Sequence, residues 1–196
     1  MKLYYSATSP YVRKVIACAI ACGTLDQITR INTSPHESPP DLLAANPLSK
    51  VPCLVTQDGF ALFDSPVICE YLDAVGGGSL FPPPGPARWR ALKRQAVGDG
   101  IMDAAVLRRG DMARPQEAAR DAAMVRQQAA IVRALDLLQA DPPANHLDIG
   151  SITVACALGY LDHRFADDPW RDGRGKLAHW YAAMEQRPEI AQSAPR

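Results

Sequence analysis

Two runs of chain-breaking residues near the middle of the sequence limit how it can fold. Three consecutive glycines occupy positions 76–78, and the segment 82–86 reads Pro-Pro-Pro-Gly-Pro. Glycine has no backbone preference, and proline lacks the N–H that a helix or a strand ladder needs, so regular structure does not continue through them. We therefore expect one domain over residues 1–77, a linker over 78–86 and a second domain over 87–196.

The part before the breakers alternates between strand and helix patterns. Apolar residues recur at helical spacing from Val12 until Gly23 ends the pattern. Residues 57–59 read Gln-Asp-Gly between two short apolar runs, which predicts a β-hairpin, and Ser65 and Pro66 suit the N-cap and first position of a helix. The expected elements are a strand over 2–6, a helix over 12–23, a strand over 27–32, hairpin strands over 53–56 and 60–63, and a helix over 65–74. This is the order of a thioredoxin-like α/β domain.

The part after the breakers is helical in character throughout, which predicts an all-α domain. The expected helices run from Trp89 past Val106, from Pro115 to Leu138, from Ile152 to His163 with Ser151 as the N-cap, and from Gly175 to Gln186. The third is apolar on all sides, as in a buried helix. Gly98 and Gly100 lie inside the first, where each costs about 1 kcal/mol relative to alanine, so we expect something to approach that backbone closely.

Charge and hydropathy exclude several classes of partner. Lys and Arg number 21 and Asp and Glu also number 21, so no net field attracts a nucleic acid or an anionic membrane. Residues 1–9 lack the apolar run of a signal peptide, and no stretch has the length of a membrane span. We expect a cytosolic protein that binds neither nucleic acid nor membranes.

The five cysteines do not form a recognisable framework. They are odd in number, scattered, and without CxxC spacing. Cys18 and Cys22 are four residues apart in a helical pattern, and one interpretation is that they share a metal; the other is that they are reduced cysteines packed inside a helix. We favour the second and expect no metal site.

Three polar segments lie where an apolar run meets a helix or strand: 8–14, 46–52 and 64–66. In this order, and with this domain layout, the chain resembles a bacterial glutathione S-transferase over essentially its whole length. The resemblance implies a thioredoxin-like N-terminal domain that binds glutathione, with an all-helical C-terminal domain. It also implies a homodimer, with glutathione as co-substrate, no bound cofactor, and a small hydrophobic electrophile as second substrate in a detoxification reaction.

Ser9 resembles the family residue that faces the sulfur of glutathione at the start of the first helix. A free thiol titrates at about 8.5, so activation below neutral pH requires a shift of roughly two units, or about 2.7 kcal/mol. One hydroxyl and a helix N-terminus supply that much together. The alternative is that Ser9 only caps the helix, and Ser6 and Thr8 are rival hydroxyls. The resemblance also places Tyr11 near glutathione or in the electrophile pocket.

The other two segments resemble the loops that hold the rest of glutathione. The backbone of Val51, before a cis Pro52, would pair with the cysteinyl part, and Lys50 would lie near the glycyl carboxylate. Asp64 and Ser65 resemble the acid–serine pair that holds the γ-glutamyl end, Ser65 with the helix N–H groups and Asp64 with the ammonium. The simpler interpretations are that Lys50 is a solvated surface lysine, that Pro52 only starts a strand, and that Ser65 is a plain helix cap.

The helical part offers two further candidates and one departure from the family. Asp99 and Asp103 lie one turn apart, and the resemblance allows them to border the electrophile pocket or to reach glutathione across a dimer; a solvated acidic face is the alternative. Many members carry Asp three residues after the helix-capping Ser or Thr, but the position after Ser151 is Val154. We therefore expect an incomplete cap on that helix.

Two other functions remain open at this stage. One is a glutathione-transferase-like protein that binds or interacts without catalysis. The other is a thiol reductase or peroxidase that uses Cys53, beside Pro52. Because Ser9 stands where such enzymes carry a cysteine, a mixed disulfide with glutathione is not possible there. Conjugation or isomerisation is the better prediction.

Overall fold

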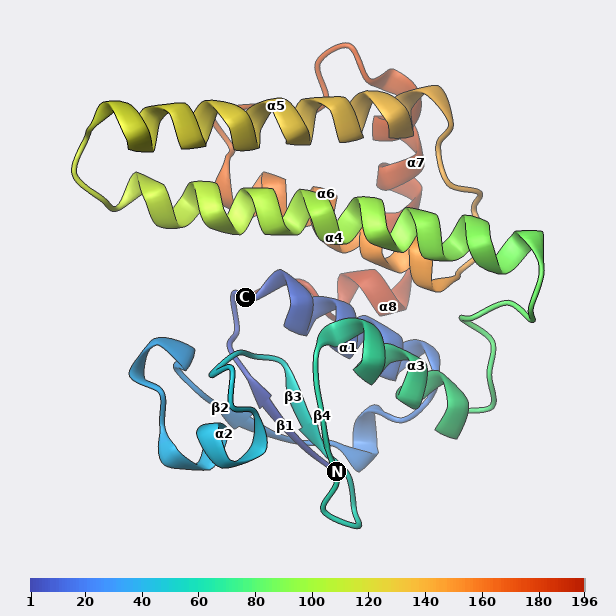
Figure 1. The fold of residues 1–196 in the computed structure, drawn as a ribbon. Coiled ribbons are helices and arrows are strands. Elements are labelled where there is room, and N and C mark those ends of the chain that lie inside the picture. The colour runs from blue at the N-terminus through green and yellow to red at the C-terminus, as the bar shows by residue number, and fades with distance from the viewer. Residues whose placement is uncertain (196) are drawn as a thin grey trace. The chain divides into compact units, whose positions relative to one another are not determined.

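The computed structural model describes residues 1–195 as two compact units (Figure 1). One consists of Met1–Arg88 together with the residues from Pro188 onward, and the other of Trp89–Arg187. The sequence-based division into 1–77, 78–86 and 87–196 differs from this at the C-terminus. The reason is the short helix α8 (Pro188–Ala191), which packs on the first helix of the N-terminal unit, where Arg13 donates a hydrogen bond to the carbonyl oxygen of Ile190 at 3.3 Å.

A four-stranded mixed sheet forms the centre of the N-terminal unit. Its strands are β1 (Lys2–Tyr5), β2 (Thr29–Asn32), β3 (Cys53–Val55) and β4 (Ala61–Leu62), in the order β2-β1-β3-β4. β1 and β2 are parallel, whereas β3 is antiparallel to both β1 and β4. The expected strands and hairpin are confirmed with shorter ends. Gly59, at φ +87°, provides the left-handed residue of the hairpin turn.

Helices α1 (Pro10–Ala21) and α3 (Ser65–Val75) lie side by side on the sheet (Figure 1). Between β2 and β3 the structure has only α2 (Pro40–Ala45) and a 3-10 turn over Pro35–Glu37, as expected for a proline-rich segment. The N-cap of α3 is Asp64 and not Ser65, which is its first helical residue. The shift of one residue follows from the extended backbone of Asp64 (φ −90°, ψ −159°).

The segment that leads from α3 to α4 is held in place at its start. The carboxylate of Asp73, which is 4% exposed, accepts hydrogen bonds from the N–H groups of Ser79, Leu80 and Phe81 at 2.7–3.2 Å. This buried carboxylate satisfies three backbone donors that no strand or helix engages. The glycine run therefore ends in a fixed turn. Helix α4 begins at Pro86, three residues before the expected helix start at Trp89.

The second unit is a helical bundle of α4 (Pro86–Met112), α5 (Ala118–Ala140), α6 (Ile149–Arg164) and α7 (Gly175–Glu185). Helices α4 and α5 run antiparallel beside each other (Figure 1). Helix α5 begins after Glu117, so Pro115 lies in the preceding loop and not at the helix start. As expected for a helix that is apolar all round, the residues of α6 from Ile149 to Leu161 are all buried.

The expected close approach to the glycines of α4 is confirmed for one of them. A Cβ atom on Gly98 would lie 2.8 Å from Cγ2 of Thr153, on α6, and 2.9 Å from its carbonyl carbon. Gly150 on α6 is equally restricted by the carbonyl oxygen of Ala91, at 2.6 Å. Gly100, in contrast, has open space around it. The glycine at 98 is thus explained by helix–helix packing.

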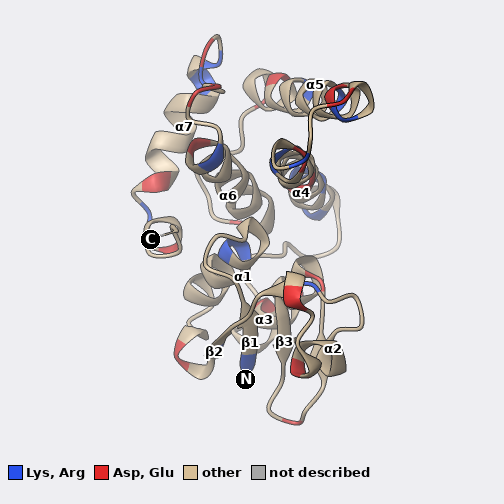
Figure 2. Ribbon diagram, turned by 90° about the vertical axis from the view of Figure 1, so that its left-hand side faces the viewer, with Lys and Arg blue, Asp and Glu red and all other residues tan. Residues whose placement is uncertain are grey.

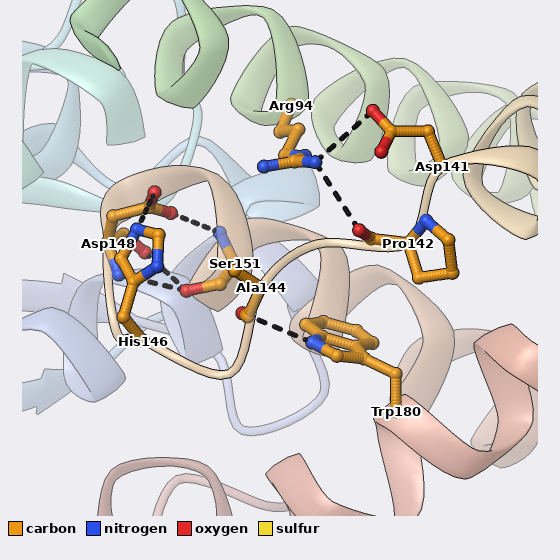
Figure 3. Close-up of polar contacts among 8 residues, drawn as sticks. All are labelled: Arg94, Asp141, Pro142, Ala144, His146, Asp148, Ser151 and Trp180. Atoms are coloured by element: carbon orange, nitrogen blue, oxygen red, sulfur yellow. Dashed lines mark hydrogen bonds and ion pairs between the residues drawn. The ribbon is translucent and has the colours of Figure 1, made fainter.

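The cap of α6 corrects the sequence-based expectation. Asp148 is the N-cap; its carboxylate accepts from the N–H of Ser151 at 2.7 Å, and the Ser151 hydroxyl accepts from the N–H of Asp148 at 2.9 Å (Figure 3). The reciprocal cap is therefore complete, but it begins three residues earlier than expected. The acid, Asp148, is the N-cap, and the hydroxyl residue, Ser151, takes the third helical position that an acid was expected to fill. Val154 takes no part in it.

The surface carries mixed charge. Figure 2 shows Lys and Arg interspersed with Asp and Glu over the helices and loops of each unit. None of the helices among the described residues combines the length and apolar character needed to cross a membrane.

Candidate active site

Three predicted segments meet at one end of the sheet. Tyr4 lies opposite Cys53, and Leu62 lies opposite Leu54, so β1 and β4 both run toward the end at which β3 begins. The chain that follows β1, the chain that precedes β3 and the chain that follows β4 therefore come together there. The N-termini of α1 and α3 lie at the same end, because each helix starts a few residues after its strand.

Ser9 occupies the N-cap of α1. Its backbone is extended (φ −75°, ψ 123°), and its hydroxyl oxygen accepts from the N–H of Val12 at 3.3 Å. The side chain is half-buried, whereas Thr8 is exposed. The cap geometry places a hydroxyl and the positive end of the α1 dipole at one point, which favours an anion. Tyr11 lies in the first turn of the same helix and is half-buried.

The segment Lys50–Val51–Pro52 leads into β3, and the Val51–Pro52 peptide bond is cis, as the family resemblance implies. Ser49 has φ +50°, and Lys50 is exposed. Within residues 1–195 the lysine forms no ion pair. Its ammonium is thus available for an anionic group.

Asn46 holds this segment in position, a role that the sequence interpretation did not assign. The side chain is 1% exposed; its Nδ2 donates to the carbonyl oxygen of Lys50 at 2.9 Å, and its Oδ1 accepts from the N–H of Leu48 at 3.0 Å. The N–H of Ser49 also donates to the Asn46 carbonyl at 3.0 Å. The available signal was an Asn followed by Pro47, a combination typical of turns closed by the Asn side chain.

Asp64 and Ser65 begin α3 with their polar groups unused. The Asp64 side chain makes no capping hydrogen bond, and the residue is exposed. Ser65 is only 2% exposed, yet its hydroxyl has no hydrogen-bond partner in the part of the chain that the structure describes. A hydroxyl at a helix N-terminus without a protein partner is suited to a bound ligand, because it can donate to an anionic group that the helix N–H groups also favour.

The remaining candidates lie elsewhere. Asp99 and Asp103 are on α4 in the helical unit, the first half-buried and the second exposed. Their proposed contact with the electrophile or with glutathione stays a prediction.

The cysteines are reduced. Cys53 is fully buried, and this burial raises the pKa of its thiol to about 11. Burial, with Asp73 nearby, raises the pKa of Cys22 to about 12. Among residues 1–195 no three His, Cys, Asp or Glu side chains are grouped in a way that could hold a metal ion. Cys18 and Cys22 are free cysteines.

The three segments bring different groups to this end of the sheet: a hydroxyl at Ser9 after β1, an ammonium at Lys50 and the backbone of Val51 before β3, and a carboxylate and a hydroxyl at Asp64 and Ser65 after β4. This set of groups suits an extended thiol peptide that carries two carboxylates and one ammonium group. The fold and this set of groups define a thioredoxin-like domain joined to a helical bundle.

Comparison with known proteins identifies the family. The model of the glutathione S-transferase N-terminal domain matches residues 8–75, and that of the glutathione S-transferase C-terminal domain matches residues 111–183. The uncharacterized GST-like protein YibF of Escherichia coli K12 is 33% identical, an alignment that covers 100% of this chain and 98% of YibF. The chain belongs to the glutathione S-transferase family, which confirms the resemblance and the fold class.

Solved structures give the same result. A glutathione transferase family member from Pseudomonas fluorescens Pf-5 with bound glutathione is 41% identical, with a TM-score of 0.93 over 100% of this chain and 98% of the other. A crystal structure with bound S-(propanoic acid)-glutathione, also of a Pseudomonas fluorescens Pf-5 family member, is 40% identical with a TM-score of 0.88 and full coverage of both chains. A glutathione S-transferase from Methylobacillus flagellatus KT with bound glutathione is 32% identical, with a TM-score of 0.89 over 100% and 99% of the two chains.

Proposed function

We propose that this protein is a glutathione transferase that binds glutathione as co-substrate and activates its thiol with the hydroxyl of Ser9. The observation that carries the proposal is the position of that hydroxyl, at the N-terminus of α1 and at the sheet end where the other two segments meet. In this proposal glutathione is held by two segments, one with Lys50, Val51 and Pro52 and the other with Asp64 and Ser65. Tyr11 would lie beside the bound glutathione.

The energetics of thiol activation fit this site. Lowering the pKa of a thiol by about two units requires about 2.7 kcal/mol. A hydrogen bond to a charged group supplies about 1.5–3 kcal/mol, and the end of a helix adds about 0.3–1 kcal/mol. Because the Ser9 hydroxyl accepts from Val12, its own proton remains available to donate to a thiolate.

The reaction we propose is conjugation to a small hydrophobic electrophile. The thiolate sulfur forms a bond to carbon, and the leaving group departs with the bonding electrons. Two supporting observations are the bound glutathione in relatives that are 41% and 32% identical, and a relative that holds an S-alkylated glutathione. Asp99 and Asp103 are our candidates for the electrophile side, and a cytosolic homodimer is the proposed form of the protein.

The chemistry of Cys53 disfavours the reductase or peroxidase alternative. At neutral pH a thiol with a pKa of about 11 is thiolate in only about one molecule in ten thousand. It is also fully buried, so neither a disulfide nor a peroxide reaches its sulfur. If a reductase activity were present, were lost in Cys53→Ala and were kept in Ser9→Ala, this alternative would be favoured again.

The test is a titration of protein-bound glutathione, following thiolate absorbance against pH in the wild type and in Ser9→Ala. We expect a bound thiol pKa below about 7.5 in the wild type and a rise of about one to two units in Ser9→Ala, because one charge-assisted hydrogen bond is lost. Thr8→Ala and Ser6→Ala, which remove neighbouring hydroxyls, are the matched controls and should leave the pKa unchanged.

Other outcomes assign the protein differently. A rise in Thr8→Ala or Ser6→Ala instead would make that residue the activating hydroxyl. Bound glutathione with an unshifted pKa would indicate a binding protein without catalysis. Absence of binding would refute the proposed function and leave only the fold.

A further inference from the structure

A hollow of about 70 Å³ lies between α4 and α5 in the helical unit, where the first part of α4 runs beside the last turn of α5 (Figure 1). One face of α4 and the C-terminal end of α5 supply its lining. We call it the α4–α5 hollow, and its residues are Arg90, Lys93, Arg94, Val97, Leu137, Leu138 and Asp141. All of them belong to the same compact unit, so the hollow is formed without the N-terminal unit.

The lining carries a net positive charge. Its three cations lie within about one turn of α4, and Asp141 is the acid among its residues, so three charges against one leave a net charge of about +2. Arg94 pairs with Asp141 at 3.3 Å, but the Asp141 side chain is 85% exposed, and an ion pair this exposed contributes little. Among the described residues, neither Arg90 nor Lys93 forms an ion pair. The hollow can therefore accept an anion.

Arg94 is fixed in position for such an anion. A Cβ atom on Gly150 of α6 would lie 2.7 Å from Cβ of Arg94, so the stem of the arginine starts from a closely packed helix crossing. Its Nη2 donates to Asp141 and to the carbonyl oxygen of Pro142, both at 3.3 Å (Figure 3). In the part of the chain that the structure describes, its Nε and Nη1 have no acceptor. A ligand can thus bind the guanidinium while the contact with Pro142 is kept.

The rest of the lining is apolar. Leu138 is 2% exposed, Val97 is half-buried and Leu137 is 45% exposed. A cavity of about 150 Å³ holds benzene, so the hollow has room for a group of a few carbon atoms. Apolar side chains beside cations suit a ligand with a short hydrocarbon group and an anionic head.

We propose that the α4–α5 hollow binds a phosphate monoester with a short apolar group. A monoester carries about 1.5 to 2 negative charges at neutral pH and three acceptor oxygens, which match the net charge and the three cationic side chains. A guanidinium binds two phosphate oxygens through parallel N–H···O bonds, and an ammonium acts on the third as a point charge. The site uses neither glutathione nor its binding segments, so it goes beyond the proposed function and does not depend on it.

The test is a calorimetric titration of the full protein with n-butyl phosphate, with inorganic phosphate and 1-butanol as reference ligands. We expect n-butyl phosphate to bind about tenfold tighter than inorganic phosphate, because about two methylene groups leave water, and 1-butanol not to bind measurably. Arg90→Gln and Lys93→Gln should each weaken the binding of n-butyl phosphate severalfold, and both residues are exposed, so the fold is kept. Asp141→Asn should strengthen it severalfold, because the acid that competes for Arg94 is removed.

Arg126→Gln and Lys50→Gln are the matched controls, and both should bind n-butyl phosphate as the wild type does. Arg126 is exposed on α5 outside the hollow, and Lys50 belongs to the proposed glutathione site. Equal weakening in Arg126→Gln would indicate a general charge effect, and weakening in Lys50→Gln would place the phosphate at the glutathione site; either result would overturn the inference. Absence of binding, equal affinity for n-butyl and inorganic phosphate, or weaker binding in Asp141→Asn would overturn it as well.

Discussion

At the scale of the residue, Asn46 fixes the backbone of the segment that leads into the candidate site. Its side chain closes the turn between α2 and β3 from inside the protein, with one hydrogen bond to the N–H of Leu48 and one to the carbonyl of Lys50. The backbone that we propose to pair with glutathione begins directly after this second bond. Asn46 is thus a positioning residue, which acts through Val51.

Substitution of Asn46 should weaken glutathione binding. We expect Asn46→Ala to raise the KM for glutathione about tenfold, because the loss of two partly buried hydrogen bonds frees the segment 48–50, while kcat at saturating glutathione changes little. Asn46→Asp should be no better, since a carboxylate oxygen would face the Lys50 carbonyl in place of a donor. Steady-state kinetics would measure both.

Asn145→Ala is the control for Asn46, as Asn145 is exposed in the loop before α6. A lower melting temperature with unchanged KM in Asn46→Ala would show that Asn46 serves stability alone.

At the scale of the element, glycines decide how closely two helices approach. Gly98 on α4 faces Thr153 on α6, and Gly150 on α6 faces Ala91 on α4, with distances to an added Cβ of 2.6–2.8 Å. Both contacts meet backbone atoms as well as side chains, so a methyl group cannot be accommodated by a rotamer change alone. The helical unit thus depends on two glycines; the sequence predicted a close approach at Gly98, but only the structure shows that Thr153 makes it and that Gly150 needs the same space.

Alanine at the two glycines of α4 should have opposite effects on stability. Gly98→Ala should lower the free energy of unfolding by about 1–3 kcal/mol, because the added methyl overlaps Thr153. Gly100→Ala should raise it by about 0.5–1 kcal/mol, because the space is open and alanine is the better helix former. Chemical denaturation of both variants would test this. Destabilisation by both would mean that α4 needs glycine flexibility rather than close packing.

At the scale of the whole molecule, the family predicts a dimer. The N-terminal unit leaves several large apolar side chains in water, among them Leu48 at 62% exposed and Phe60 at 63%. Single exposed apolar residues are ordinary on a monomer, so they do not by themselves establish an interface. The prediction therefore rests on the resemblance.

Sedimentation equilibrium at micromolar concentration should give twice the mass of the chain, since a stable homodimer interface holds at that concentration. Dilution toward nanomolar concentration would indicate how tight the interface is. A monomeric mass at micromolar concentration would contradict the prediction, and it would also remove the proposed role of Asp99 across the dimer.

Local patterns were sufficient for most of the fold. Helical spacing, the Gln-Asp-Gly turn and the breaker segments predicted the strands, the main helices and the two-part layout, because each depends on neighbouring residues alone. Caps were predicted less well. The choice between Asp64 and Ser65, or between Asp148 and Ser151, depends on which residue has an extended backbone, and both residue types are good caps.

The sequence by itself determined the kind of protein: a thioredoxin-like domain with Ser9 before its first helix, followed by helices. Only the tertiary structure showed that Asn46 holds the Lys50 segment, that Thr153 is the residue that approaches Gly98, and that the residues from Pro188 onward return to the N-terminal unit. These contacts join residues from 2 to 177 positions apart. A pattern of neighbours predicts backbone conformation, whereas contacts between elements follow from which faces pack together, and that is decided by the whole core.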